Sequence, residues 1–436
     1  MKNEKMNEDL APIPFRILKF CGWWRPLNLS TWSRAVYSCF TVVMLTLLVT
    51  ITLTVLIGVT QMSATDDLFA DNVFLMFALI NSVFKATNVL LSRRRFIKML
   101  EIVQDTRWRD LRNDEEIEIQ DRYRKTIRKI SVYFTTAVFI AIVLRVVAPL
   151  LDLSDEIKLP VDAYCPCDIR HSSCYWTLYW HQAFGTGVAT LTHAAKDCLI
   201  SALLLQTCAQ LEILKNRLLS IADTCVVAGN KTGAADRVEK LEQKLIGECV
   251  RDHESIFEFA KILNDSLNVM LFGQIAVTIP NLCLSIYLLS TQKIASMDFM
   301  MTTQFFSAVV IELFFFCWYG NEVTLNSLDV ENAISEMNWT LLSTRSKKDL
   351  LMMMVRTSRP ILFRVGPIMN MNIDSFLSVS LNMRTFSTNL GEFVSYMIVL
   401  SDHENILFCL QRFAVYWRLA NVYKMIIKDK VLVLKK

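Results

Sequence analysis

The 26 residues from Ala35 to Thr60 read AVYSCFTVVMLTLLVTITLTVLIGVT, and none of them is charged. The charged residues nearest to this run are Arg34 and Asp66. A helix of about 20 apolar residues crosses the roughly 30 Å of hydrocarbon in a bilayer, because it satisfies its own backbone polar groups. The run therefore predicts a membrane-spanning helix and an integral membrane protein.

The rest of the chain repeats this apolar pattern. Of its 436 residues, 53% are hydrophobic and only 11 are glycine, a composition that a soluble protein of this size seldom has. We expect an all-α polytopic protein with seven transmembrane helices, at about 35–60, 68–91, 130–151, 175–211, 267–290, 299–319 and 383–400. They make a transmembrane domain of residues 35–400, between a cytoplasmic segment (1–34) and a basic tail (401–436).

Positive charge predicts the orientation of these spans, since Lys and Arg are retained on the cytoplasmic side. The amino-terminal segment holds 6 of them, the connection between spans 2 and 3 holds 12, and that between spans 4 and 5 holds 8. The connections between spans 1 and 2, 3 and 4, and 5 and 6 hold 0, 2 and 1. We therefore predict an intracellular amino terminus. Seven crossings require an extracellular carboxyl terminus, whereas the basic residues of the tail favour the cytoplasmic side. Either the tail lies on the outer surface of the membrane, or the number of crossings is off by one.

Charged residues at helical spacing lie next to several spans. They fill the stretch between Lys98 and Lys129, follow span 4 from Gln210 to Arg217, and precede span 5 from Asp236 to Lys261. We expect spans 2 and 3 to continue into the cytoplasm, helices 4 to 6 to extend there into an anchor, and a loop to lie at 222–235.

Ionisable side chains also lie inside the apolar spans. Arg145, His181, His193 and Glu312 are the main examples, and such groups are functional suspects because burying charge in hydrocarbon is costly. For the two histidines we favour an internal hydrogen bond. Span 7 is more polar than the others, so it needs water or protein beside it.

Several function classes lack support. The sequence has no phosphate loop, no nucleophile elbow and no His-Glu-x-x-His string, so we expect no enzyme, no cofactor and no metal site. The net charge is only +4, and the basic clusters fit membrane topology, so no nucleic-acid partner is expected. We also expect no signal peptide before the first span, since the first 30 residues lack an apolar core with a cleavage site.

Short strings make the interpretation more specific. They are Asp197-Cys198-Leu199, QLEILKNRL at 210–218, ECVRDHESI at 248–256, YGNE at 319–322 and SYMIVL at 395–400. In combination they resemble the insect odorant receptors, in the style of ants, bees and wasps, over about residues 10–400. The chain departs from that family by extra residues between Pro360 and Tyr396 and by the tail after Leu400.

The resemblance implies a subunit of a ligand-gated, non-selective cation channel in the plasma membrane of olfactory neuron dendrites. Such subunits form tetramers with co-receptor subunits, and each contributes its last helix to a central pore for cations. On this chain, Val399 would form the hydrophobic constriction, Asp402 would lie near the outer mouth, and Glu392 would face water or a neighbouring subunit.

The resemblance also implies a pocket for small volatile odorants in the outer halves of helices 2, 3, 4 and 6, since an apolar ligand needs an enclosed apolar space. Simple core packing is the alternative for every candidate. The predicted lining residues are Phe74, Phe77, Leu144, Val147, Tyr179, Phe184, Gly187 and Phe305.

The three cysteines Cys165, Cys167 and Cys174 share one short loop, which faces the oxidising exterior in the predicted topology. One disulfide between Cys174 and either partner is expected there. A zinc site fits the spacing less well.

Three other membrane classes compete with this interpretation. A gustatory-type receptor channel would share the mechanism and differ in its ligand. A metabotropic seven-helix receptor would place the amino terminus outside, and the sequence has neither an Asp-Arg-Tyr string at the end of helix 3 nor an Asn-Pro-x-x-Tyr string in helix 7. A transporter should show internal repeats, and none is visible.

Overall fold

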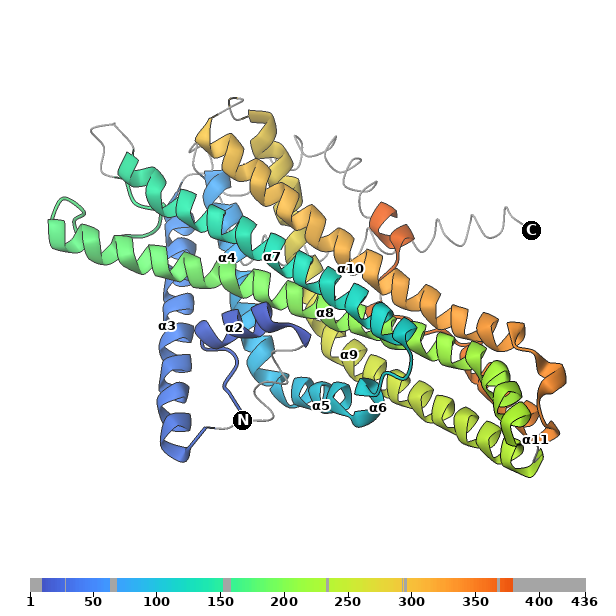
Figure 1. The fold of residues 1–436 in the computed structure, drawn as a ribbon. Helices are drawn as coiled ribbons and strands as arrows, with labels where there is room; N and C mark the ends of the chain where they lie inside the picture. The colour runs from blue at the N-terminus through green and yellow to red at the C-terminus, as the bar shows by residue number, and fades with distance from the viewer. Residues whose placement is uncertain are drawn as a thin grey trace, which may run out of the picture.

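The computed structural model describes residues 10–27, 29–62, 69–151, 158–232, 235–291, 293, 296–366 and 369–378 (Figure 1). The helices are α2 (Pro12–Phe20), α3 (Thr31–Gln61), α4 (Phe69–Leu91), α5 (Arg93–Gln104), α6 (Thr106–Arg109), α7 (Asp114–Leu151), α8 (Ser172–Thr232), α9 (Ala235–Thr291), α10 (Met297–Glu336) and α11 (Thr344–Thr357), with a 3₁₀ turn at Trp339–Leu341. Strands β1 (Arg364–Val365) and β2 (Met369–Asn370) form one antiparallel hairpin. The predicted span at 383–400 and the tail lie outside the described residues.

The described helices account for the membrane-spanning character of the chain. Among the described residues, α3, α4, α7, α8 and α10 are each long and apolar enough to cross a bilayer. Helix α9 makes a sixth span if its two halves, which meet at a bend of 42° between Asn268 and Met270, are one crossing. Helices therefore lie over each of the first six predicted spans, and the fold is the all-α polytopic one expected.

Helix α8 is the centre of the bundle. Within its most apolar 18-residue window 94% of residues are buried, whereas the corresponding share is 0% for α7, which leaves α7 at the periphery. Small residues allow this central position, because they let neighbouring backbones approach closely. At Gly185 an added Cβ would lie only 3.0 Å from the side chain of Ile51 on α3.

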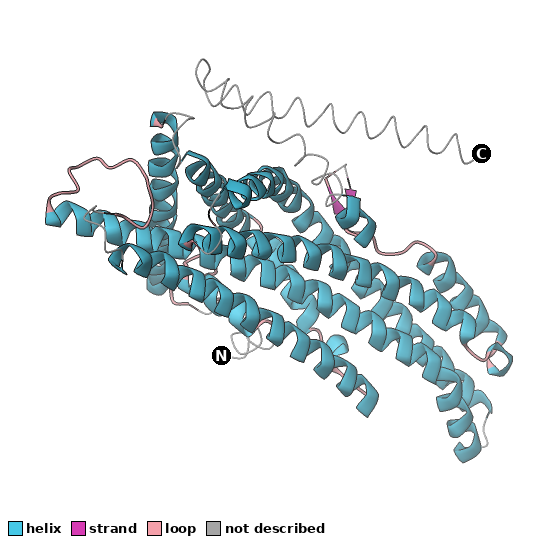
Figure 2. Ribbon diagram, turned by 90° about the horizontal axis from the view of Figure 1, so that it is seen from above, coloured by secondary structure: helices cyan, strands magenta, loops and turns pink. Residues whose placement is uncertain are grey.

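Helices α8, α9 and α10 continue side by side beyond the amino-terminal end of α7, and α11 packs against α9 and α10 there (Figures 1 and 2). Helices 4 to 6 are therefore extended as predicted, and the cytoplasmic side of the extension and its role as an anchor stay predictions. The loop predicted at 222–235 is wrong, since α8 runs on to Thr232. Ile221, Ala222 and Cys225 are buried, so tertiary packing outweighs the glycines that suggested a loop.

The continuation of span 2 is also wrong. Helix α4 ends at Leu91, and α5 turns away from its axis after a break at Ser92 (Figure 1). Phe96, Met99 and Leu100 of α5 are buried, so its apolar face packs against the bundle and draws the chain aside. Span 3 does extend, as the first half of α7.

The amino-terminal segment is packed into the bundle. Phe15, Leu18, Trp23 and Trp24 are almost completely buried, and α2 contacts α8 and α7. The indole Nε1 of Trp23 donates a hydrogen bond to Oγ1 of Thr192 on α8, at 2.7 Å. Burial of these aromatic rings makes residues 10–25 part of the core.

The β1–β2 hairpin packs against α9 through β1, and Met371, which follows β2, lies close to α10. Val365 pairs with Met369 in its register, and Gly366 has a positive φ of +59°, which glycine adopts without strain. At Gly320 of α10 an added Cβ would lie 2.8 Å from the backbone oxygen of Met371. This close approach fixes α10 against the segment that leads to the end of the chain.

Candidate functional site

Three charged side chains from three different helices meet in the interior. The ammonium of Lys85 on α4 donates to both carboxylate oxygens of Asp197 on α8, at 2.7 and 2.8 Å, and to Oε1 of Glu312 on α10, at 2.8 Å. The Lys85 side chain is 0% exposed, and those of Asp197 and Glu312 are 7% and 12% exposed. We call these three residues the ionic cluster.

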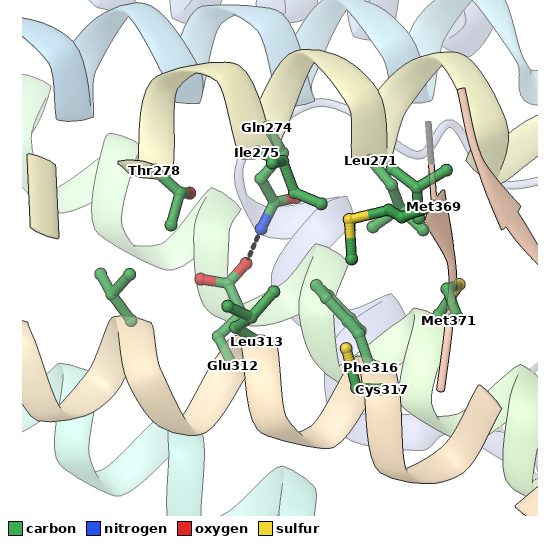
Figure 3. A pocket seen from close by; sticks show the side chains of 12 residues that line it. Leu271, Gln274, Ile275, Thr278, Glu312, Leu313, Phe316, Cys317, Met369 and Met371 are labelled. Carbon is green, nitrogen blue, oxygen red and sulfur yellow. Dashed lines mark hydrogen bonds between the residues drawn. The ribbon is translucent and has the colours of Figure 1, made fainter. Parts of the chain in front are cut away.

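Further polar groups join the ionic cluster to the other helices. The amide nitrogen of Gln274 on α9 donates to Oε1 of Glu312, so the cluster touches four helices (Figure 3). Lys196 lies fully buried beside it, where it donates to Oδ1 of Asn88 at 3.2 Å and lies 4.4 Å from the ring centre of Phe96. With Lys196 included, two cationic and two anionic side chains balance formally.

The geometry makes this cluster a strong constraint on the bundle. An ammonium has three N–H donors, and Lys85 has three acceptor contacts to use them. Removing one partner of such a buried set leaves an uncompensated charge in a low-dielectric interior, which costs far more than the intact set contributes. Helices α4, α8 and α10 are therefore held in one arrangement at this level.

The sequence pointed to only part of this site. Glu312 and His193 were predicted as polar groups within spans, and Nε2 of His193 forms a hydrogen bond with the backbone oxygen of Ala78 on α4, at 3.2 Å. The signal for Lys85 and Asp197 was present as charges inside apolar runs. Their pairing depends on how the helices pack, which local patterns do not encode.

A small cavity lies next to the ionic cluster, between α9, α10 and the β1–β2 hairpin (Figure 3). The centre of a water molecule can occupy about 20 Å³ of this cavity, which is enough space for one water. The side-chain oxygen of Gln274 is buried here without a hydrogen-bond partner among the described residues. The other lining residues are almost all apolar: Leu271, Ile275, Thr278, Val309, Leu313, Phe316, Cys317, Val365, Met369 and Met371, together with Glu312.

The structure brings some of the predicted ligand residues together. Phe74 on α4 and Phe305 on α10 make an edge-to-face contact with ring centres 4.3 Å apart. Tyr179 on α8 is buried, and its hydroxyl donates to the backbone oxygen of Val146 on α7, at 2.5 Å. The first contact joins α4 to α10, and the second joins α7 to α8. On α4, α8 and α10, these residues lie closer to the amino-terminal end of the helix than the ionic cluster does.

The remaining predicted ligand residues lie in varied surroundings. Gly187 is buried, Phe77, Leu144 and Val147 are half-buried, and Phe184 is 61% exposed with its ring next to Trp180. The predicted pore residues Glu392, Val399 and Asp402 lie outside the described residues.

The loop before α8 is fastened in two ways. A disulfide joins Cys167 to Cys174, whose Cα atoms are 6.3 Å apart, and Cys165 is free. The backbone N–H of Tyr164 donates to the carbonyl of Thr54 on α3, at 3.0 Å, and that of Val161 donates to Oε1 of Gln182 on α8, also at 3.0 Å. The loop therefore packs against α3 and α8.

A second buried ionic group lies in the extended part of the bundle. Arg217 on α8 donates to Glu116 on α7 at 3.0 and 2.9 Å, to Asp252 on α9 at 2.9 Å, and to the backbone oxygen of Asp110 at 2.7 Å. Burial raises the pKa of Asp252, and Arg217 opposes that rise. This second group links three helices where the chain has left the predicted bilayer.

Burial of His253 in the same region should make the stability of the protein depend on pH. It is 5% exposed, its ring lies 4.6 Å from that of Phe257, and burial together with the charge of Arg356 lowers its pKa from 6.5 to about 4. A lowered histidine pKa means that the unfolded chain binds the proton more readily, so stability present above pH 6.5 is lost as the pH falls towards 4. We expect acidification from about pH 7 to about pH 4.5 to lower the free energy of unfolding of the wild type by about 2–3 kcal/mol more than that of His253→Phe. The melting temperature of the wild type should fall further accordingly.

The matched control for this prediction is His171→Phe, because His171 lies exposed in the loop before α8. It should keep the pH dependence of the wild type when both are followed by thermal unfolding in detergent. An identical pH dependence in the wild type and His253→Phe would contradict the argument.

Comparison with known proteins identifies a family that this chain matches. The family model described as "7tm Odorant receptor" matches residues 67–383. Odorant receptor 2a of Drosophila melanogaster is 25% identical over 382 residues, which cover 84% of this chain and 92% of that protein. Odorant receptor Or1 of Anopheles gambiae is 23% identical over 61% of this chain. The match spans 64% of the length of Or1, which is less than two thirds of that relative.

A solved structure shares the fold. The insect olfactory receptor OR5 of Machilis hrabei, determined in complex with eugenol, superposes with a TM-score of 0.74 at 14% identity. The match covers 90% of this chain and 100% of that one. At this identity the likeness concerns the fold alone.

Proposed function

Since the chain belongs to the 7tm odorant receptor family, we propose that it is a subunit of an odorant-gated, non-selective cation channel. The observation that carries the proposal is the family match over residues 67–383, which includes every helix of the ionic cluster. The expected ligands are small, volatile and apolar.

The proposed ligand chamber lies on the outer side of the ionic cluster. On three helices the predicted ligand residue precedes the charged one: Phe74 precedes Lys85, Tyr179 precedes Asp197, and Phe305 precedes Glu312. At 1.5 Å per residue these separations are about 16, 27 and 10 Å. With an intracellular amino terminus, α4, α8 and α10 all run inwards, so the ionic cluster is the floor of the chamber.

This arrangement supplies a route from ligand to pore. A ligand that separates Phe74 from Phe305 would shift the outer part of α10 relative to α4. Glu312 is held by Lys85, so we propose that α10 pivots there and that its inner part moves against Met371 through the close contact at Gly320. Met371 lies just before the predicted pore helix, and small shifts there would be passed to the constriction at Val399.

We propose that the extended part of α8, α9, α10 and α11 joins this subunit to co-receptor subunits in a tetramer in the plasma membrane. Leu351, Met352 and Val355 on α11 are 53%, 73% and 74% exposed. Large apolar side chains that lie outside the bilayer and face solvent are typical of a protein interface.

Expression in a cell line tests the proposal directly. We expect a panel of volatiles to evoke cation current when the chain is expressed with an insect co-receptor. Phe305→Ala should weaken the response to the best ligand at least about tenfold in concentration, since it removes a ring that closes the chamber. Phe139→Ala, which truncates a phenylalanine 63% exposed on the peripheral α7, is the matched control and should respond like the wild type. No current in any combination, with surface delivery shown, would contradict the proposal.

A further inference from the structure

Two arginines meet at the point where α4 gives way to α5. The guanidinium of Arg93, the first residue of α5, lies 5.7 Å from the ring centre of Trp24, and its Nη2 donates to the backbone oxygen of Arg25 at 3.0 Å. Burial, and after it the nearby charge of Arg25, lowers the pKa of Arg93. Two like charges are thus held close together.

These arginines lack a negative partner within the described part of the chain. The ion pairs found there include neither Arg25 nor Arg93. The Nε of Arg93 is buried, and no described atom accepts its hydrogen bond. A buried donor left without an acceptor costs free energy, and so does an uncompensated charge. The site is therefore incomplete as the chain alone makes it.

Helix polarity adds to the excess of positive potential. Helix α5 opens with Arg93, Arg94 and Arg95, has no acidic residue in its first turn, and receives no side-chain cap from Ser92. The amino-terminal end of a helix favours negative charge and disfavours positive charge. The arginines in that turn therefore oppose the helix dipole, and a bound anion would relieve this.

The site lies at the level expected for lipid headgroups. The apolar helix α4 ends at Leu91, which is 85% exposed, and Arg93 follows two residues later. The hydroxyl of Tyr37 donates to the carbonyls of Lys19 and Trp24, at 2.9 and 3.0 Å, and so fixes the segment that carries Arg25. An acyl chain can lie against the exposed end of α4 while a headgroup reaches the arginines.

We propose that Arg93 and Arg25 bind the phosphate of an anionic phospholipid at the surface of the inner leaflet. A guanidinium binds phosphate oxygens through two parallel hydrogen bonds, and the Arg93 side chain is partly exposed, so a headgroup can reach it. The inner leaflet carries anionic lipid, and the predicted orientation places Arg93 on that side. The bound phosphate neutralises the paired arginines and the first turn of α5, and so stabilises the break between α4 and α5.

Nanodiscs provide the test. The full chain is reconstituted in phosphatidylcholine alone and in phosphatidylcholine with increasing phosphatidylserine, and its thermal unfolding is followed. Phosphatidylserine should raise the melting temperature of the wild type by a few degrees. Arg93→Gln should weaken the apparent affinity for phosphatidylserine at least about tenfold, and Arg25→Gln, which keeps the backbone oxygen that holds Arg93, should weaken it as well.

The matched control is Arg94→Gln, which removes the same charge from the next residue, whose side chain is exposed. It should keep the response of the wild type. Equal losses in Arg94→Gln and Arg93→Gln would show diffuse attraction and overturn the proposal, as would the absence of any shift in the wild type. An equal rise with inorganic phosphate in phosphatidylcholine discs would show a soluble anion and also overturn it. If Arg93→Gln does not fold, an unchanged response in Arg25→Gln decides against the site.

Discussion

A chain that carries Lys85→Met is expected to fold poorly and to reach the cell surface in much smaller amount than the wild type. The substitution leaves the carboxylates of Asp197 and Glu312 facing each other in the interior, with their shared cation gone. Breaking a buried ion pair in this way typically costs about 3–5 kcal/mol, a large part of the stability of a protein. Surface biotinylation and size-exclusion profiles of detergent extracts measure the loss.

Two further chains make this prediction specific. Lys98→Met is the matched control, since Lys98 and Glu258 are 56% and 54% exposed in their ion pair, and an exposed pair contributes under about 1 kcal/mol. A chain that combines Lys85→Met with Asp197→Asn and Glu312→Gln has no stranded charge and should recover much of the loss. Equal expression of Lys85→Met and Lys98→Met would contradict the role assigned to the ionic cluster.

Arg217→Met is expected to destabilise the extended part of the bundle to a similar degree, by about 3–5 kcal/mol. It removes the guanidinium that holds Glu116, Asp252 and the backbone of Asp110, and the Arg217 side chain is only 7% exposed. Because the proposed subunit interface lies on the same helices, the substitution should also reduce assembly with co-receptor. Thermal unfolding and co-purification measure the two effects.

Arg122→Met is the matched control for Arg217→Met. Arg122 pairs with Glu212, yet its side chain is 60% exposed, so the pair should contribute under about 1 kcal/mol. A melting temperature and a co-receptor yield that fall equally in both chains would contradict the prediction.

The spans were predictable because hydrocarbon imposes a local rule. Ala35–Thr60 is apolar throughout, and α3 covers it. Where chain packing decides instead, local patterns failed. The glycines near 230 favoured a loop, but burial of Ile221 and Cys225 continues α8. The turn at Ser92 likewise follows from packing of Phe96, which hydropathy alone does not distinguish from a straight continuation.

The candidate site, too, was predictable only where a local sequence pattern marks a residue. Glu312 stood out in the sequence because a carboxylate inside a phenylalanine-rich run has few explanations. Its partner Lys85 lies 227 positions away, and only the packed bundle brings the two within 2.8 Å. The contact between Phe74 and Phe305 is equally remote in sequence; the family resemblance placed both rings in a predicted pocket but did not predict that they touch.

Excised outside-out patches give the most direct test of the central claim, that this chain is itself part of the pore. In a patch that contains the chain and a co-receptor, with a pipette solution free of nucleotides against the cytoplasmic face, a volatile active in intact cells should still open cation channels, because gating needs only the subunits in the membrane. A response that is present in intact cells and absent from such patches would contradict the account and indicate a metabotropic receptor.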